Sequence, residues 1–332
     1  MKAQPRSPEL TFNSKVDHSI GQRLAPWFHE VWPAYRRWFG LRKQPLSASG
    51  GRQMLATHMP ELVPTYDALC TTLNADEEMA SFLSLYNPPT FRAACSQVIW
   101  AREPLQLIRN YDFPAHLSDR QLLHSNWNGT RVIAMTDCLW GVLDGMNEHG
   151  LALSLAYGGR ENRGEGFAIT LVLRYILEFC KTSVEAVAVL QRVPIHMPYN
   201  ISLLDSLGDT RTVVICPGEE VQVTQLPFAT NHQSDGVLEQ LDTTADSILR
   251  ESYLATRLAD RAQTDSGLLQ LFMKPPLLRR ASNWKGWGTL YTAKYDIRNG
   301  VVELHWPDGN VLKQSFSDPG ERTLKVTSPG FN

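Results

Sequence analysis

Cys95 is the side chain in this sequence best placed to do chemistry. It stands in Ala94-Cys95-Ser96, ahead of a predicted β-hairpin whose second strand carries Arg109-Asn-Tyr-Asp112. A thiol attacks a carbonyl carbon as the thiolate, and its reference pKa of about 8.5 calls for a base or a positive neighbour. A cut after the small residue Ala94 would give Cys95 a free α-amine, whose reference pKa of about 7.7–8.0 suits a base near neutral pH. The pattern predicts a thiol nucleophile that uses its own α-amine as base.

The elements that position Cys95 read mainly as β-strands, because β-branched and aromatic residues alternate between glycine-rich turns. Strands are predicted at 98–101, 105–109, 130–136, 138–143, 151–157, 199–204, 212–216, 221–224, 228–231, 288–296 and 301–306. Helices are predicted at 167–179, 183–190 and 244–262. This order suits two stacked antiparallel sheets covered by helices on both faces.

The ninety-odd residues before Cys95 look helical instead. Apolar and aromatic residues recur at spacings of three and four between Gln22 and Phe39, a pattern typical of core packing. Further helices are predicted from Arg52 and from Asp76 to Leu85, and Asn87-Pro88-Pro89 then breaks the chain.

Composition excludes several classes of function. The 332 residues are 43% apolar and 20% charged with a net charge of −2, which leaves no electrostatic footprint for nucleic acid. No apolar run approaches the roughly 20 residues of a membrane span, and the N-terminus lacks a secretory signal, so we expect a cytoplasmic protein. Five widely spaced cysteines indicate neither a disulfide framework nor a zinc site. Nothing in the sequence suggests a metal cluster or a cofactor.

Four segments that occur in the following order are typical of one protein family: Cys95-Ser96-Gln97, Arg109–Phe113, Leu143–Ala152 and Ala229–Gln233. With the strand at 288–296, they resemble the acyl-coenzyme A:6-aminopenicillanate acyltransferase family, also called the C45 cysteine peptidase family. Choloylglycine hydrolases and acid ceramidase are more distant relatives with a similar plan. Each segment alone is weak, but the four in this order are specific and span nearly the whole chain.

The resemblance implies an α+β fold, the four-layer αββα sandwich of N-terminal nucleophile hydrolases, with a helical N-terminal leader. It implies a propeptide-like region at 1–94 and a catalytic domain at 95–332, which stay associated after self-cleavage between Ala94 and Cys95. It also implies transfer of an acyl group from a small-molecule amide or thioester, through a thioester on Cys95. Whether water or an amine accepts that acyl group stays open.

The resemblance assigns roles to particular residues as well. Arg109 would lie beside the thiolate, Asp112 would orient the new α-amine, and Asn231 and Tyr157 would form the oxyanion hole. Secondary candidates are Ser96, Asn110, His232 and Lys285.

This sequence departs from the family pattern in two places. Lys285-Gly-Trp-Gly288 stands where the penicillin enzyme has a Ser-Arg pair, so Lys285 is the candidate to compensate. Cys216 falls near the position of a serine important in that enzyme. The departures suggest a substrate other than penicillins.

Plainer interpretations exist beside these. Arg109 and Asp112 could form a surface ion pair that closes a turn, and Asn231-His232 could satisfy a strand end. We interpret the following residues as structural or solvent-exposed: Asp137 and Cys138 at the start of a strand, His149 in a turn, and Arg250 and Arg257 on a polar helix. A role in substrate binding is the alternative for the two arginines.

Two other functions remain open. One is a choloylglycine- or ceramidase-like amidase acting on a lipid amide, with which the aromatic leader is compatible. The other is an unprocessed, inactive relative that binds an acylated ligand in the same pocket.

Overall fold

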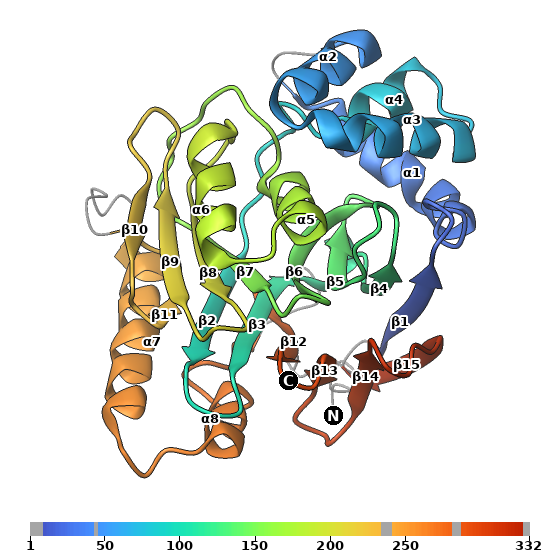
Figure 1. The fold of residues 1–332 in the computed structure, drawn as a ribbon. Helices are drawn as coiled ribbons and strands as arrows, with labels where there is room; N and C mark the ends of the chain where they lie inside the picture. Colours follow the sequence, from blue (N-terminus) through green and yellow to red (C-terminus); the bar gives the residue numbers. More distant parts are fainter. Residues whose placement is uncertain (1–8, 43–45, 234–240, 281–286, 328–332) are drawn as a thin grey trace, which may run out of the picture.

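A computed structural model of the chain describes residues 9–42, 46–233, 241–280 and 287–327. Within these residues two sheets lie face to face (Figure 1). The larger has the order β10 (Gln222–Thr224), β9 (Thr210–Ile215), β8 (Tyr199–Leu204), β7 (Ala152–Tyr157), β6 (Gly141–Asn147), β5 (Val132–Asp137), β4 (Gln121–Ser125), β1 (Glu9–Asp17) and β15 (Arg322–Thr327). The smaller has the order β11 (Phe228–Ala229), β2 (Ala94–Trp100), β3 (Gln106–Pro114), β12 (Trp287–Asp296), β13 (Val301–His305) and β14 (Val311–Ser315).

Helices cover the outer face of each sheet. α5 (Ile169–Phe179) and α6 (Ser183–Arg192) pack on the larger sheet, and α7 (Leu241–Ala259) and α8 (Asp265–Phe272) pack on the smaller one. A capping box between Thr182 and Glu185 begins α6. The four-layer αββα sandwich is confirmed.

β2 and β3 are buried along their whole length. They have the larger sheet on one face and α7 with α8 on the other, so both faces are covered. Their antiparallel register pairs Cys95 with Tyr111 and Ala94 with Asp112. Side chains alternate across a strand, so Cys95 faces the larger sheet while Asp112 faces the helices.

The segment before Cys95 forms a helical cluster beside the sandwich (Figure 1). It contains α1 (Ala25–Phe39), α2 (Ala48–His58), the 3₁₀ turn Pro60–Leu62, α3 (Val63–Thr72) and α4 (Glu77–Leu83). Phe28, Trp32 and Phe39 of α1 are buried, with ring centroids 6.0, 5.3 and 5.3 Å from that of Phe82 in α4. The aromatic stripe is therefore core packing, as predicted.

The start of this segment differs from the helical expectation. Residues 9–17 form β1, which pairs in parallel with β4 and antiparallel with β15 inside the larger sheet. Phe12 of β1 is fully buried, its ring centroid 4.9 Å from that of Trp306 and 6.0 Å from that of Tyr291. The leader therefore contributes a strand to the sandwich core.

The prediction that Asp137-Cys138 opens a strand is wrong. Asp137 ends β5, and Cys138 and Leu139 form the connecting turn with φ values of 54° and 72°. Strands β4, β14 and β15 and helix α8 were also not predicted. None of the helices in the described ranges is long and apolar enough to span a membrane.

We predict that Phe12→Ala lowers the free energy of unfolding by about 3–5 kcal/mol, because it opens a cavity between two buried aromatic rings. Chemical denaturation of the whole chain measures this. Glu9→Ala, which removes a surface ion pair with Lys325, serves as the control and should cost less than about 1 kcal/mol. Equal stability of the two variants would contradict an integral role for β1.

Candidate active site around Cys95

Cys95 lies fully buried at the head of β2 with a cation against its thiol. Arg109 Nη2 on β3 donates to Cys95 Sγ at 3.2 Å. Burial raises the pKa of the Cys95 thiol, and the charge of Arg109 opposes that rise. Arg109 is placed to stabilise a thiolate once one forms.

Arg109 is held in turn by Asp144 of β6. Their buried ion pair crosses from the smaller sheet to the larger one, and Tyr291 Oη and Tyr295 Oη of β12 also donate to the Asp144 carboxylate. Neither Arg109 nor Asp144 is exposed. The alternative of a surface ion pair between Arg109 and Asp112 is therefore wrong. Asp144 was not a candidate from sequence, although Asp-Gly lies in one of the family-like segments.

Asn231 follows β11 and brackets the Ala94–Cys95 bond. Its Oδ1 accepts from the backbone N–H of Cys95 at 2.6 Å, and its Nδ2 donates to the carbonyl oxygens of Ala93 and Tyr157, both at 3.1 Å. The predicted proximity of Asn231 and Cys95 is present. An amide N–H at this place is the type of donor that stabilises an oxyanion.

Neighbouring residues fix the backbone around Asn231. Asn200 Nδ2 on β8 donates to the carbonyl oxygens of Thr230 at 3.0 Å and His232 at 2.9 Å, and Asn231 N donates to Ser247 Oγ of α7 at 2.7 Å. Gly159 has a φ of +75°, and a Cβ there would lie 2.3 Å from the Asn231 carbonyl oxygen. Only glycine permits this close approach.

Asp112 lies across from Ala94 in the strand register, and one oxygen of its carboxylate has no hydrogen-bond partner among the described residues. Thr289 Oγ1 donates to Asp112 Oδ1 at 2.7 Å, whereas Oδ2 is buried without a hydrogen-bond partner among the described residues. Burial raises the pKa of Asp112 to about 6, opposed by the charge of Arg250. Because a buried polar atom normally has a hydrogen-bond partner, Oδ2 is an acceptor that is available to an additional donor.

Three other candidates, Tyr157, His232 and Asn110, also make polar contacts near Cys95 or in the helices over the smaller sheet. Tyr157 presents its backbone carbonyl to Asn231, while its hydroxyl donates to the carbonyl oxygen of Arg160. The ring of His232 contacts Ser247 Oγ at 2.9 Å and Glu251 at 3.5 Å, both on α7.

Asn110 anchors α8. Its Nδ2 donates to the carbonyl oxygens of Phe272 at 2.8 Å and Leu277 at 3.0 Å. His232 and Asn110 thus tie the neighbouring helices to the smaller sheet.

Arg250, predicted to lie on a solvated helix face, is a further functional candidate. That prediction is wrong, because Arg250 is fully buried. Its Nη1 donates to Cys95 O at 2.6 Å and to the secondary candidate Ser96 Oγ at 2.7 Å, and its Nη2 donates to Asn231 Oδ1 at 3.1 Å. The polar composition of α7 masked it. Arg257 of the same helix is exposed as expected.

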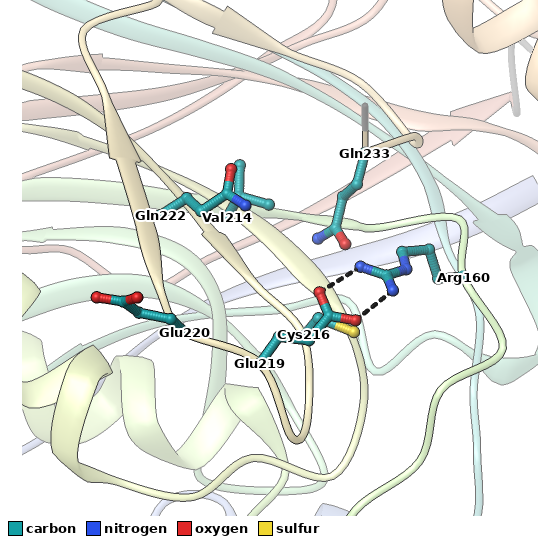
Figure 2. A pocket seen from close by; sticks show the side chains of 7 residues that line it. All are labelled: Arg160, Val214, Cys216, Glu219, Glu220, Gln222 and Gln233. Atoms are coloured by element: carbon teal, nitrogen blue, oxygen red, sulfur yellow. Dashed lines mark hydrogen bonds and ion pairs between the residues drawn. The ribbon is translucent and has the colours of Figure 1, made fainter. Parts of the chain in front are cut away.

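The two residues at the departures from the family pattern are Lys285 and Cys216. Lys285 lies outside the described residues. Cys216 follows β9 and lines a small hollow with Gln233 and the ion pair Arg160–Glu219 (Figure 2). Burial raises the pKa of Cys216 to about 11, so it stays a protonated thiol near neutral pH.

A pocket of about 360 Å³ lies between α1 and the end of β3. Its apolar lining includes Trp27, Val31, Trp38, Phe91, Phe113 and Leu117. Phe91 lies in the segment that leads into Cys95, and the ring of Phe113 stacks on that of Tyr111, the register partner of Cys95. The pocket thus reaches the surroundings of the Ala94–Cys95 bond from the side of the N-terminal helices.

The polar part of the pocket lining includes two buried acidic side chains, Asp119 and Asp137, that both contact the hydroxyl group of Tyr35. Tyr35 Oη of α1 lies 2.6 Å from Asp119 Oδ1 and 3.1 Å from Asp137 Oδ1, and its single proton can be donated to either carboxylate. The same hydroxyl oxygen accepts from the N–H of Cys138 at 3.0 Å. Burial raises the pKa of Asp119 and brings that of Asp137 to about 6. Asp137 is thus structural, as expected, but as part of a buried network. Within the described ranges, this cluster included, no group of three or more His, Cys, Asp and Glu side chains is arranged to hold a metal ion.

The αββα sandwich with Cys95 at the head of a central strand is the fold of the N-terminal nucleophile hydrolases. Residues 101–310 match the family described as acyl-coenzyme A:6-aminopenicillanic acid acyl-transferase. Because the match covers more than half of the sequence, the chain belongs to this family. The match begins after Cys95 and includes Arg109, Asp112, Asn231 and Arg250.

Solved structures with a similar arrangement share little sequence. A penicillin V acylase from Agrobacterium tumefaciens is 14% identical with a TM-score of 0.49, covering 71% of this chain and 92% of its own. A mutant conjugated bile acid hydrolase from Clostridium perfringens is 13% identical with a TM-score of 0.47, covering 72% and 98%. An N-acylethanolamine-hydrolyzing acid amidase ortholog from Caenorhabditis elegans is 16% identical with a TM-score of 0.43, covering 61% and 93%. Among curated protein sequences, no match to this chain was found.

We predict that Asp144→Asn lowers the free energy of unfolding by about 3–5 kcal/mol, because it leaves the guanidinium of Arg109 buried without a counter-ion. Urea unfolding at neutral pH measures this. Asp67→Asn breaks an exposed pair with Arg52 and should cost less than about 1 kcal/mol. If the two substitutions cost the same, the Arg109–Asp144 pair does not carry the stability assigned to it.

We also predict that stability falls as pH rises through about 6, because the raised pKa values of Asp119 and Asp137 mean that the folded chain holds protons that the unfolded chain releases. Asp137→Asn should make this fall smaller between pH 5 and 8. At pH 8 its Tm should exceed that of the wild type by about 1–2 °C per kcal/mol regained. Thermal unfolding in a pH series tests this, with Asp67→Asn expected to follow the wild-type slope.

Proposed function

We propose that the chain cuts itself between Ala94 and Cys95 and then acts as a cysteine amidohydrolase or acyltransferase. The observation that carries this is the bracketing of one peptide bond: Arg109 contacts the Cys95 thiol, while Asn231 contacts the Cys95 N–H and the Ala93 carbonyl. These groups surround both the nucleophile and the bond it would break. Membership of an acyltransferase family supports the same chemistry.

Self-cleavage would begin with attack of Cys95 Sγ on the carbonyl carbon of Ala94. The C–N bond breaks, the C–S bond of a thioester forms, and the nitrogen of Cys95 takes a proton to become the α-amine. Water then hydrolyses the thioester, which releases the carboxylate of Ala94 and the free thiol. The unsatisfied Oδ2 of Asp112, across from Ala94, is an acceptor suited to the new α-ammonium.

In the cut protein the α-amine would take the proton of Sγ, and the thiolate would attack the carbonyl carbon of an acyl amide or thioester. Asn231 Nδ2, no longer occupied by the Ala93 carbonyl, would donate to the oxyanion. The α-ammonium would protonate the leaving amine, and water or a second amine would then take the acyl group from Cys95. Arg109 would hold the thiolate form ready throughout.

The fragments 1–94 and 95–332 should stay associated after the cut. Strand β1 belongs to the first fragment but lies between β4 and β15 of the second, and Phe12 is buried among residues of the second. Several backbone hydrogen bonds and a buried aromatic contact would have to break for the fragments to separate.

A lipid-amide amidase is the second candidate, and one observation favours it. The pocket of about 360 Å³ beside Phe91 and Phe113 is lined largely by apolar side chains. A pocket of this size and lining suits an extended acyl group better than a polar one.

We predict that the purified wild-type chain consists of two fragments, 1–94 and 95–332, whereas Cys95→Ala stays intact, because it lacks the attacking sulfur. Intact-mass spectrometry under denaturing conditions measures this. Cys70→Ala removes a half-buried cysteine from α3 and should be cut like the wild type. Cleavage before residue 95 in Cys95→Ala would exclude self-processing by this thiol.

The substrate class can then be read from the cut protein. N-acyl amino acids, penicillins and acyl amides of increasing chain length are offered, and the thioester on Cys95 is sought by mass. A rate that rises with acyl length favours the lipid-amide candidate. Binding without turnover by any of them would favour an inactive relative.

A further inference from the structure

Arg250 joins the nucleophile to the proposed oxyanion donor. Its guanidinium donates to the Cys95 carbonyl at 2.6 Å and to Asn231 Oδ1 at 3.1 Å. Asp246, one turn earlier on α7, accepts from Arg250 Nε at 3.0 Å and from Arg279 Nη2 at 3.2 Å. A fully buried guanidinium with this many directed contacts is held in a single orientation.

These contacts determine which way the Asn231 amide points. Oδ1 accepts from both the Cys95 N–H and Arg250 Nη2, so the NH₂ group must face the carbonyls of Ala93 and Tyr157. A flipped amide would set its NH₂ against two donors and its oxygen against two acceptors. That arrangement loses every hydrogen bond of the side chain in a buried place.

We propose that Arg250 is a positioning residue for acyl transfer: it fixes the Cys95 carbonyl and the Asn231 amide, and its charge favours the neutral, proton-accepting form of the α-amine created by cleavage. The second part rests on the proposed function, because only cleavage creates that amine. Arg250 acts through Asn231 and the backbone of Cys95 and need not touch the substrate.

The charges around Cys95 set the sign of this effect. Asp112 favours a protonated α-amine, whereas the guanidinium groups of Arg250 and Arg109 oppose it. Asp144 neutralises Arg109, whereas Asp246 is a single carboxylate shared by the guanidinium groups of Arg250 and Arg279, so a positive charge remains on the helix side opposite Asp112. The titratable and charged groups facing Cys95 from the elements packed against it are Arg109, Tyr111 and Asp112 on β3, Tyr157 on β7, Asp246 and Arg250 on α7, and Arg279 after α8.

The test compares Arg250→Gln and Arg250→Lys with Arg257→Gln. Arg257 lies two turns further along α7, exposed to solvent, with its guanidinium 5.0 Å from the centroid of the Tyr253 ring. For each full-length chain we would measure cleavage by mass, Tm, and the pH dependence of kcat/KM toward an acyl amide that the wild type hydrolyses.

For Arg250→Gln we expect the acidic limb of the kcat/KM profile to move up by about one pH unit, because Asp112 then acts on the α-amine with one opposing guanidinium group fewer. We also expect kcat to fall at least about tenfold, because the Asn231 amide is no longer held. Arg250→Lys keeps the charge but not the forked contacts, so its acidic limb should stay in place while kcat falls. Arg257→Gln should match the wild type.

If both Arg250 variants fold, either of two outcomes overturns the proposal. In the first, Arg250→Gln matches Arg257→Gln both in kcat and in the position of the acidic limb. In the second, Arg250→Gln and Arg250→Lys lose kcat to the same extent and the acidic limb moves in neither. A folded Arg250→Gln chain, judged by Tm, that stays uncut supports the positioning role, since Ala94 and Cys95 are still present. If Arg250→Gln does not fold, Arg250→Lys decides, and wild-type kcat in that variant overturns the proposal. A wild type that is neither cut nor active would instead refute the proposed function.

Discussion

One buried ion pair, between Arg109 and Asp144, joins the two sheets at the point where the candidate nucleophile lies. A guanidinium without a counter-ion would be too costly to bury here, so Asp144 and the two tyrosines that donate to it make the contact between Arg109 and Cys95 possible. The spacing of the sheets, the rotamer of Arg109 and the environment of the thiol are thus set together. A structural ion pair and a candidate catalytic contact share the same guanidinium.

Around this pair, polar groups come from the larger sheet on one side and from the helical layer over the smaller sheet on the other. Asn200 of the larger sheet and Ser247 of α7 each form a hydrogen bond with the backbone around Asn231. Gly159, which has no side chain, allows this backbone to approach the loop after β7 closely. Arg250 reaches down from α7 on the face of the smaller sheet away from Arg109. Cys95 is therefore contacted from the sheet side through its sulfur and from the helix side through its backbone.

Much of this could be predicted from the sequence, because local pattern reveals strands that are apolar throughout and turns rich in glycine. Cys95, Arg109, Asp112 and Asn231 were found by type and order, and the structure brings them together. Arg250 was missed because helical periodicity reports only average polarity, and nothing local distinguishes a buried arginine from an exposed one. Asp144 was missed because its partner is 35 residues away in another sheet. Strand β1 was missed because its polar alternation makes sense only beside β4 and β15, which are distant in sequence.

The position of β1 has a consequence for how such a protein can be made. A gene that began at Cys95 would encode every residue proposed to act on an acyl group, yet β4 and β15 would face a gap one strand wide. Both would present unpaired backbone groups to solvent, the exposed edges through which sheets add foreign strands and aggregate. The N-terminal segment is therefore a structural part of the larger sheet, and we expect residues 95–332 to fold only when they are synthesised in one chain with it.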